Sequence, residues 1–457
     1  MDTKKLRQKI LDLAIHGKLV PQDPNDEPAS VLLERIKAEK ERLIKEGKIK
    51  RTKKSAKSSD TPHYQQVKLE VPNSWYMVSV SDLFLLNPKS ELDDNMKVGF
   101  IPMALVEDGF SGNHFYEERT WKDVKRGYCH FQNGDIGIAK ISPCFENRKS
   151  TIFKNLPNTY GAGTTELVIL RPIKVYTKFY LYLFKSDWYV KEGTKYFKGV
   201  VGQQRVHKEI FTDLYIPFPP FAEQQRIVEE IEYWFALIDQ IEQDKSDLQT
   251  AIRQTKSKIL DLAIHGKLVP QDPNDELASE LLKRINPKAK ITCDNGHSKK
   301  LPQNWSISTV GNVLQLKSGE NIKIRQLPMG GKYPIYGGNG INGFYNKCNV
   351  SESTIIIGRV GFYCGSVFLT ESKAWVTDNA LIVSGYEGIY NTIYLAYLLQ
   401  YLNLGKVSNS TAQPVISRKG INPIPILIPP LSEQQRIVTK IEKLFSVLDN
   451  IQNALEA

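Results

Sequence analysis

The chain contains one stretch twice without a change: KILDLAIHGKLVPQDPNDE, at residues 9–27 and again at residues 258–276. A second block occurs in two similar forms: IPFPPFAEQQRIVEEIE begins at Ile216, and ILIPPLSEQQRIVTKIE begins at Ile426. A weaker match sets VPNSWYMVSVSDL beside LPQNWSISTVGNV, around Trp75 and Trp305. The stretches between these blocks resemble each other far less. Repeats of this kind predict two copies of one structural frame.

The order of the repeats predicts a ring with two-fold pseudosymmetry. Laid end to end, the last and the first residues of the chain rebuild the connecting segment that lies intact between the two halves. The ring is therefore opened inside one of its two connecting segments. Chain termini often lie close together in compact proteins, which makes such an opening tolerable.

The connecting segments are predicted to be long helices. Apolar residues recur at alternating four- and three-residue steps over 227–262, and the pattern continues over 437–455 and 6–13. This period is typical of a coiled-coil seam, so we expect a helix over 223–265, about 65 Å long, paired antiparallel with a helix built from both termini. The alternative is two separate surface helices whose apolar stripes face their own domains. The seam positions of the central copy are Ile227, Ile231, Trp234, Ile238, Ile241, Lys245, Leu248, Ile252, Thr255, Ile259 and Leu262.

The ends of these helices carry start and stop signals. Ser432 and Gln435 form a capping-box pattern at the start of the last helix. Gly17 and Gly266 suit the left-handed position that follows a helix, and the prolines beyond them prevent continuation.

Two mixed α/β domains are expected between the helices. Strand-like runs such as IGIAKI and TIIIGRV alternate with aromatic helical stretches such as KFYLYLFKSDWYV and TIYLAYLLQYL. Each domain is preceded by a basic or polar linker, which is either a solvated tether or a loose arm that contacts phosphates. The expected segments are 1–36 for the N-terminal part of the distal helix, 37–63 for a basic linker, 64–221 for the first domain, 222–285 for the central helix and the segment after it, 286–300 for the second linker, 301–431 for the second domain and 432–457 for the C-terminal part of the distal helix.

Composition places the chain among proteins that form a core and bind polyanions. Of 457 residues, 41% are hydrophobic and 24% are charged, which argues against wholesale disorder. Lys and Arg total 61 against 50 Asp and Glu, and the formal charge of +11 favours nucleic acid as a partner. No apolar run reaches ~18 residues, so we expect no membrane span. The five cysteines include no C-x-x-C pair, so a reducing cytoplasm is the expected compartment.

Catalytic signatures are missing from the sequence. The chain has no GxxxxGK[ST] phosphate loop, and its FPPF and IPPL strings lack the polar residue with which an adenine or cytosine methyltransferase binds an exocyclic amine. The run GRVG at 358–361 is expected to form a hairpin rather than a dinucleotide loop. The chain is therefore predicted to be non-catalytic, without a cofactor or a metal site. A self-sufficient methyltransferase or nuclease remains the alternative that cofactor binding by the purified chain would reveal.

The identity of the repeated string extends to its polar positions. A coiled-coil seam constrains only about two residues in seven, so packing of the helices alone does not explain this identity. Two copies of one partner, each docked on an equivalent surface, would explain it, and two different domains on that frame then suggest two different targets. The alternative is a recent duplication that has not yet diverged.

With these motifs the chain resembles the specificity subunits of type I restriction–modification systems over nearly its whole length. The resemblance rests on the Pro-Pro-[Phe/Leu]-[Ala/Ser]-Glu-Gln-Gln-Arg-Ile-Val motif from Pro219 and from Pro429, on the [Val/Leu]-Pro-x-x-Trp openings at Trp75 and Trp305, and on the twice-present string LAIHGKLVPQ. It implies two inverted target recognition domains on antiparallel helices, each reading one half of a bipartite double-stranded DNA site. It also implies as partners two adenine-methyltransferase (modification) subunits that use S-adenosylmethionine, and ATP-dependent restriction/translocase subunits. A stand-alone architectural or regulatory DNA-binding protein is the alternative function.

Candidate DNA-reading residues are amides and basic side chains on loops rich in small residues, where the backbone can approach a duplex. In the first domain they are Lys140, Asn147, Arg148, Lys149, Lys198, Gln203, Gln204, Arg205, His207 and Lys208. In the second domain they are Asn339, Asn342, Tyr345, Arg359, Asn409, Ser410, Thr411, Gln413, Arg418 and Lys419. Gln203 and Gln413 occupy equivalent positions, and a glutamine can bond N6 and N7 of adenine. For any single residue, a solvated turn is the competing interpretation.

A second set of residues begins the two long helices and is expected to contact a partner subunit or the paired helix. Its members are Glu223, Gln224, Gln225, Arg226, Ile227, Ile231, Ile238, Glu433, Gln434, Gln435, Arg436, Ile437 and Ile441.

Overall fold

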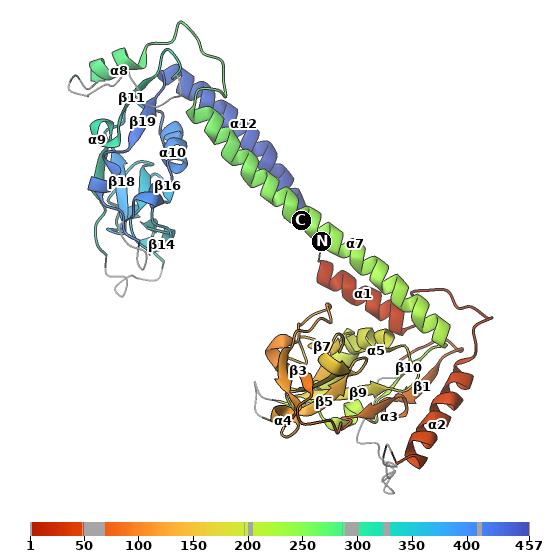
Figure 1. The fold of residues 1–457 in the computed structure, drawn as a ribbon. Coiled ribbons are helices and arrows are strands. Elements are labelled where there is room, and N and C mark those ends of the chain that lie inside the picture. The colour runs from red at the N-terminus through yellow and green to blue at the C-terminus, as the bar shows by residue number, and fades with distance from the viewer. Residues whose placement is uncertain are drawn as a thin grey trace. The chain divides into compact units, whose positions relative to one another are not determined.

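The computed structural model describes residues 2–47, 49, 69–195, 197–199, 204–285, 287, 301–322, 330–408 and 414–456. The chain divides into two compact units, Met1–Gln243 and Asp244–Ala457, and the long helix α7 (Phe221–Ile264) contributes one half to each. Each unit combines a mixed α/β domain with a pair of helices (Figure 1). The predicted mixed α/β class is therefore confirmed for both domains. None of the helices in the described ranges is both long and apolar enough to cross a membrane.

The first domain contains two four-stranded sheets and a short ribbon. One sheet has the order β2-β9-β6-β7, the other β4-β3-β8-β5, and the ribbon pairs β1 with β10. Phe131 and Phe153 stack between the sheets with their ring centroids 3.7 Å apart. The strands are β1 (Tyr76–Ser79), β2 (Phe84–Leu86), β3 (Lys97–Ile101), β4 (Glu117–Thr120), β5 (Cys129–Gln132), β6 (Ile136–Ala139), β7 (Ser150–Ile152), β8 (Tyr160–Gly163), β9 (Leu167–Pro172) and β10 (Tyr215–Phe218). The helices of this unit are α1 (Thr3–Ile15), α2 (Ala29–Lys45), α3 (Val80–Leu83), α4 (Trp121–Val124), α5 (Thr177–Phe184) and α6 (Asp187–Thr194), with 3-10 turns η1 (Met103–Leu105), η2 (Pro157–Thr159) and η3 (Lys208–Phe211).

The second domain repeats one of these sheets, three strands of the other, and the ribbon. Its antiparallel sheet has the order β12-β18-β15-β16, which matches β2-β9-β6-β7 strand for strand, and β11 pairs with β19 as β1 pairs with β10. Its other sheet, β14-β13-β17, matches β4-β3-β8, because β13 pairs antiparallel with β14 and parallel with β17 as β3 does with β4 and β8. Within the described residues it has no counterpart of the edge strand β5. The strands are β11 (Ser306–Thr309), β12 (Gln315–Ser318), β13 (Tyr333–Gly337), β14 (Gly340–Tyr345), β15 (Ile355–Gly358), β16 (Val367–Leu369), β17 (Trp375–Val376), β18 (Ala380–Ser384) and β19 (Pro425–Ile428). The helices are α8 (Ala278–Ile285), α9 (Val310–Val313), α10 (Thr392–Tyr401), α11 (Arg418–Ile421) and α12 (Leu431–Glu456), with the 3-10 turn η5 (Leu404–Val407).

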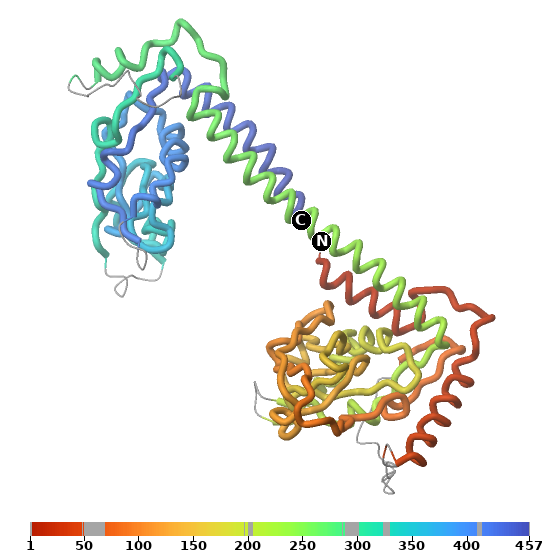
Figure 2. The backbone as a smooth tube through the Cα atoms, in the orientation of Figure 1, coloured from red at the N-terminus to blue at the C-terminus, as the bar shows by residue number. Residues whose placement is uncertain are grey.

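Within each unit, α7 pairs antiparallel with a terminal helix (Figure 2). In the N-terminal unit the guanidinium of Arg7 on α1 donates to Glu242 at 3.0 Å and also pairs with Asp239. In the C-terminal unit Lys256 of α7 pairs with Asp449 of α12. One continuous core joins each domain to its own helices, with Trp75 and Ile231 in one cluster and Trp305 and Ile437 in the other.

The apolar seam of α7 is buried at some positions and exposed at others. Ile227, Ile231 and Ile238 are buried in the N-terminal unit, and Ile252 and Ile259 are buried in the C-terminal unit. The seam positions Trp234, Ile241 and Leu248 are exposed, which corrects the prediction of an unbroken seam. Ile241 and Leu248 lie near the ends of the partner helices, because α1 begins at Thr3 and the described part of α12 ends at Glu456. Trp234 lies between the buried Ile231 and Ile238, and its indole N–H donates to Glu230.

Two other sequence expectations need correction. Ser432 lies inside α12, after Leu431, and its hydroxyl bonds Asp275, so it is not an N-cap and the capping box is wrong. The first part of the predicted linker at 37–63 is helical, because α2 extends to Lys45 and buries Leu32 and Ile36 in the core. Most of the remaining linker residues and most of 286–300 lie outside the described residues. The predicted left-handed glycines are confirmed, with φ of +64° at both Gly17 and Gly266.

Replacement of Ile238 by aspartate tests the helix pairing in the N-terminal unit. The Ile238 side chain is 1% exposed, so a carboxylate in its place would be removed from water. We expect Ile238→Asp to lower the free energy of unfolding by about 3 kcal/mol or more, measured by urea denaturation. Leu237→Asp is the matched control: Leu237 is 39% exposed, and its loss should stay within about 0.5 kcal/mol. Equal losses for both variants would contradict the pairing.

Candidate nucleic-acid interface

A buried carboxylate ties each domain to its long helix. Near the start of α7, Glu223 accepts the indole N–H of Trp75 at 2.9 Å and the side-chain amide of Gln22 at 2.6 Å. In the C-terminal unit Glu433 accepts Trp305 at 2.8 Å and Gln271 at 2.6 Å. Burial raises the pKa of both carboxyl groups above the ordinary glutamate value. We call these two clusters the joints.

The residues that follow each glutamate complete the joint. Gln224 accepts the backbone N–H of Tyr176 at 3.0 Å and donates to the carbonyl of Pro219 at 2.9 Å. Arg226 makes a two-fold ion pair with Asp26, at 2.9 and 2.6 Å. In the C-terminal unit Gln434 accepts the N–H of Asn391 at 2.7 Å, and Arg436 pairs with Asp275 at 3.1 and 2.6 Å.

The joints give a further explanation for the repeated string. Gln22 and Asp26 belong to the first copy of QDPNDE, and Gln271 and Asp275 to the second. These polar residues are engaged inside the chain, so docking of a partner is not required to explain why they repeat. Glu223, Gln224, Glu433 and Gln434 are buried in the joints, whereas Gln225 and Gln435 are exposed. Ile227, Ile231, Ile238, Ile437 and Ile441 are buried in the two cores.

In the first domain a basic residue follows the central strand β6 and is held between two other segments. The backbone N–H of Lys140 donates to the carbonyl of Glu166 at 2.9 Å, and the carbonyl of Lys140 accepts Val206 N–H at 2.8 Å. Two residues on, the N–H of Ser142 donates to Gln204 at 2.8 Å. These bonds bring Lys140 beside Gln204 and Arg205, which the sequence had placed far apart.

Arg359 occupies the same place in the second domain, directly after β15. Its N–H donates to the carbonyl of Asn379 at 2.9 Å, and its carbonyl accepts Ile416 N–H at 2.9 Å. Two residues on, the N–H of Gly361 donates to Pro414 at 3.0 Å. Lys140 and Arg359 are therefore structural equivalents, which the sequence did not reveal because the stretches between the repeats do not align. The sequence did carry one sign of this equivalence: Lys140 follows the apolar run IGIA, and Arg359 follows the apolar run IIIG.

The neighbours of this position differ between the domains. In the first domain Arg205 forms a two-fold ion pair with Glu166, at 2.8 and 3.0 Å, and this pairing lowers the pKa of Glu166. In the second domain the corresponding positions carry Val415 and Asn379, so the pair is absent there. The two domains thus offer different chemistry at one shared place.

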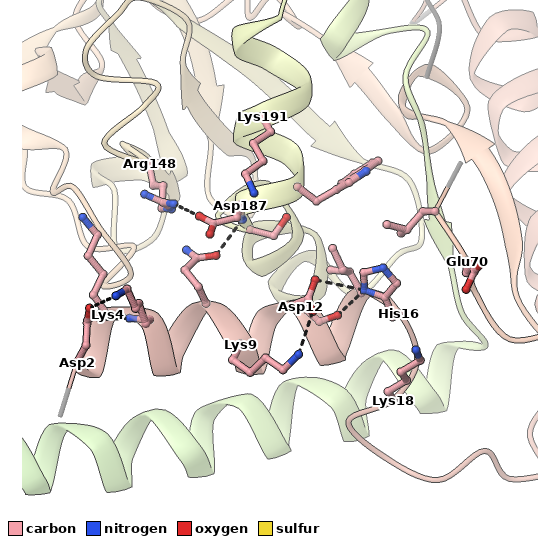
Figure 3. A pocket seen from close by; sticks show the side chains of 16 residues that line it. Asp2, Lys4, Lys9, Asp12, His16, Lys18, Glu70, Arg148, Asp187 and Lys191 are labelled. Carbon is pink, nitrogen blue, oxygen red and sulfur yellow. Dashed lines mark hydrogen bonds and ion pairs between the residues drawn. The ribbon is translucent and has the colours of Figure 1, made fainter. Parts of the chain in front are cut away.

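The side chains of two candidate DNA-reading residues form hydrogen bonds within the first domain instead. Arg148 donates from Nε to the carbonyl of Lys185 at 3.0 Å and pairs with Asp187 (Figure 3). Lys149 donates to the carbonyls of Val106 at 2.8 Å and Met103 at 3.3 Å. Their charges satisfy backbone carbonyls and a carboxylate within the domain, so their assignment to DNA is corrected, whereas Asn147 beside them is exposed.

The remaining candidates fall into three groups. Lys198, Lys208, Asn339, Asn342, Arg418 and Lys419 are exposed, and Gln204, His207 and Tyr345 are partly buried, the last with its ring 5.3 Å from that of Trp375. Asn339 lies at the tip of the β13–β14 hairpin, which approaches Arg359 through Gly338. Gln203, Asn409, Ser410, Thr411 and Gln413 lie outside the described residues. The predicted hairpin at 358–361 is confirmed, because β15 and β16 pair antiparallel on either side of it.

Two domains of different sequence are each attached through an equivalent joint to a shared helix, and each places a basic residue at one matched position, an arrangement that suits a DNA specificity protein. The family model of the type I restriction modification DNA specificity domain matches residues 72–250 and 302–457, and the chain belongs to this family. It is a specificity subunit and not the catalytic part of such a system.

The sequence similarity to known specificity subunits extends over almost the whole chain. The chain is 34% identical to the type I restriction enzyme EcoAI specificity subunit of Escherichia coli, over 98% of this chain and 90% of that protein. It is 33% identical to the EcoEI specificity subunit of the same organism, over 99% and 91%. Among solved structures, a type I R-M system chain gives a TM-score of 0.61 at 16% identity, covering 84% of this chain and 93% of that chain. The HsdS subunit from Thermoanaerobacter tengcongensis gives 0.53 at 16% identity, covering 86% and 93%, and both likenesses concern the fold alone.

The buried lysine behind Arg148 gives a pH-dependent test of this part of the domain. Lys185 is fully buried and donates from Nζ to the carbonyls of Gly109 at 2.8 Å and Arg148 at 3.0 Å. Burial lowers the pKa of Lys185 to about 7. Between pH 7 and about 10 the unfolded chain therefore binds the proton that the folded chain has lost, so folding stability rises with pH by up to about 1.4 kcal/mol per unit.

We expect Lys185→Met to remove this rise. The difference in free energy of unfolding between the wild type and this variant should increase in favour of the wild type from pH 7 to about pH 10, and should stay constant below pH 6. Urea denaturation at several pH values measures it, with exposed Lys191→Met as the control. A difference that does not change over that window would show that Lys185 titrates as an ordinary lysine.

Proposed function

We propose that each mixed α/β domain of this specificity subunit reads one half of a bipartite site in double-stranded DNA. The reading domains correspond to residues 64–221 and 301–431, in an inverted arrangement related by the pseudo-two-fold axis of the repeats. An antiparallel coiled coil, formed by α7 with α1 and α12, sets the distance between them. The half-sites then lie on the order of one duplex turn apart, ~34 Å, because both domains face the same side of the DNA.

The matched position of Lys140 and Arg359 carries this proposal. Each residue directly follows the third strand of its domain's matched antiparallel sheet, and the same two backbone hydrogen bonds hold it, with a third matched bond two residues further on. An arginine can bond N7 and O6 of guanine through two N–H groups, while a lysine contacts either a phosphate or a base acceptor. Two domains that read different half-sites need this combination: the same position on the fold, with a different side chain at it in each domain.

The polar loops beside this position extend the proposed interface. The hairpin tip with Asn339 and the exposed Asn342 supply amides in the second domain, and Lys198 and Lys208 supply charge in the first. Gln203 and Gln413 remain proposed adenine readers. Contacts to bases give specificity, while lysines and arginines on phosphates give affinity and register.

The exposed faces of the helices are the proposed docking sites of the partners. Two modification subunits bind there and methylate adenine with S-adenosylmethionine, and restriction subunits join to cleave unmethylated DNA with ATP. The exposed Gln225 and Gln435 lie at equivalent positions next to the joints, where two identical partners could contact them in the same way.

Sequencing that detects N6-methyladenine in genomic DNA tests this function. Removal of the chain from its cell should erase methylation at one motif with two specified halves and an unspecified gap. Arg359→Ala should weaken binding by about 1–3 kcal/mol and relax base selection in one half only, and Lys140→Ala should affect only the other half.

Lys373→Ala is the control for Arg359, because Lys373 is exposed near the opposite end of the β15–β16 hairpin. It should leave the motif unchanged. A continuous motif, or relaxation of both halves by a single substitution, would contradict division of the site between the domains.

A further inference from the structure

The second domain has a solvent-exposed phenylalanine three residues after Arg359. Phe362 is 92% exposed, and its ring lies 5.2 Å from that of Tyr363, which is also exposed. Both belong to the connection between β15 and β16, directly after Arg359. An aromatic side chain so fully exposed gains nothing from the core of its own domain, and the Phe362–Tyr363 pair is accessible to another molecule.

The loop that carries Phe362 is anchored on two sides. At its base the N–H of Gly365 donates to Gly358 at 2.8 Å, and the N–H of Gly358 donates to Ser366 at 2.7 Å. On one flank the N–H of Gly361 donates to the carbonyl of Pro414 at 3.0 Å. On the other, the backbone of Gly365 approaches Gly405 so closely that a Cβ on Gly365 would lie 2.2 Å from the Gly405 nitrogen. The loop that carries the Phe362 ring is therefore fixed by backbone contacts at its base and on both flanks.

The charges around this loop favour DNA as the molecule that contacts Phe362. Arg359 precedes the aromatic pair, and the exposed Lys406 follows the Gly405 contact. The acidic residues Glu352 and Glu371 lie near the other end of the hairpin, since β15 and β16 pair from Ile355 to Gly358. A polyanion can approach the aromatic tip without meeting these carboxylates. The tip is also continuous with the proposed base-reading position, which is three residues away.

We propose that Phe362 is an aromatic wedge that inserts between base pairs of the second half-site. Proteins that distort DNA place apolar side chains, phenylalanine among them, between base steps, and cations on the neighbouring phosphates hold the wedge in place. Here the exposed Lys406 supplies such a cation, and Arg359 beside the wedge reads a base. The residue at the corresponding place in the first domain is Pro143, so the two half-sites are contacted differently. This inference rests on the proposed reading of DNA by the second domain.

Local unstacking measured in the assembled specificity–modification complex tests the wedge. The DNA is a duplex with the motif found by methylation sequencing and with 2-aminopurine placed at each purine of the second half-site in turn, because its fluorescence rises when stacking is lost. The wild-type complex should raise the fluorescence at one step severalfold. Phe362→Ala should abolish the rise and weaken binding about tenfold, while Phe362→Trp should retain both.

Leu369→Ala is the matched control, since Leu369 is 42% exposed on the same hairpin and pairs with Ile355 at its other end. It should behave as the wild type. If Phe362→Ala binds and unstacks as the wild type does, the wedge is wrong even though bipartite recognition holds. If the wild-type complex does not select the second half-site at all, the proposed function itself has failed, and the wedge with it.

Discussion

The rest of the structure depends on a carboxylate buried near the start of each long helix. Glu223 and Glu433 each accept one indole N–H and one amide, and they bring together three segments that are distant in the sequence. A carboxylate removed from water needs such donors, because an unpaired buried charge costs far more than the hydrogen bonds gain. Each joint therefore admits one arrangement of tryptophan, repeated string and helix, and each domain is attached to its helices in the same way.

Because both units have this joint, the frame that they share can be distinguished from the elements in which they differ. The joints, the short ribbons, one antiparallel sheet and three strands of the other sheet occur in both units, whereas the edge strand β5 and the loops around Lys140 and Arg359 differ. Because the variable elements are attached to a common sheet, a change of loop chemistry alters what is contacted without altering how the domain is held. The proposed function needs this property, since it has partner subunits meet the same frame whatever sequence is read.

The sequence predicted those features whose signal is local or repeated. The helices of 223–265 and 432–457, the left-handed glycines and the mixed class of the domains followed from periodicity and composition. The sheet order and the equivalence of Lys140 with Arg359 did not, because strand pairing joins residues far apart and the domains no longer align. Arg148 and Lys149 looked like surface cations, since a basic residue that satisfies buried carbonyls has the same sequence signature as an exposed one. The QDPNDE string was noticed, but its contact with Glu223 and Glu433 depends on tertiary structure.

Hydrogen exchange of the tryptophan indole protons, followed by NMR, tests the joints most directly. The chain has six tryptophans. The indole protons of Trp75 and Trp305 should exchange much more slowly than that of Trp234, whose N–H bonds Glu230 in an exposed position. Glu223→Ala should accelerate Trp75 alone, and Glu433→Ala should accelerate Trp305 alone. If Trp75 and Trp305 exchange as fast as Trp234 in the unaltered chain, the buried carboxylates do not hold the domains and the account is wrong.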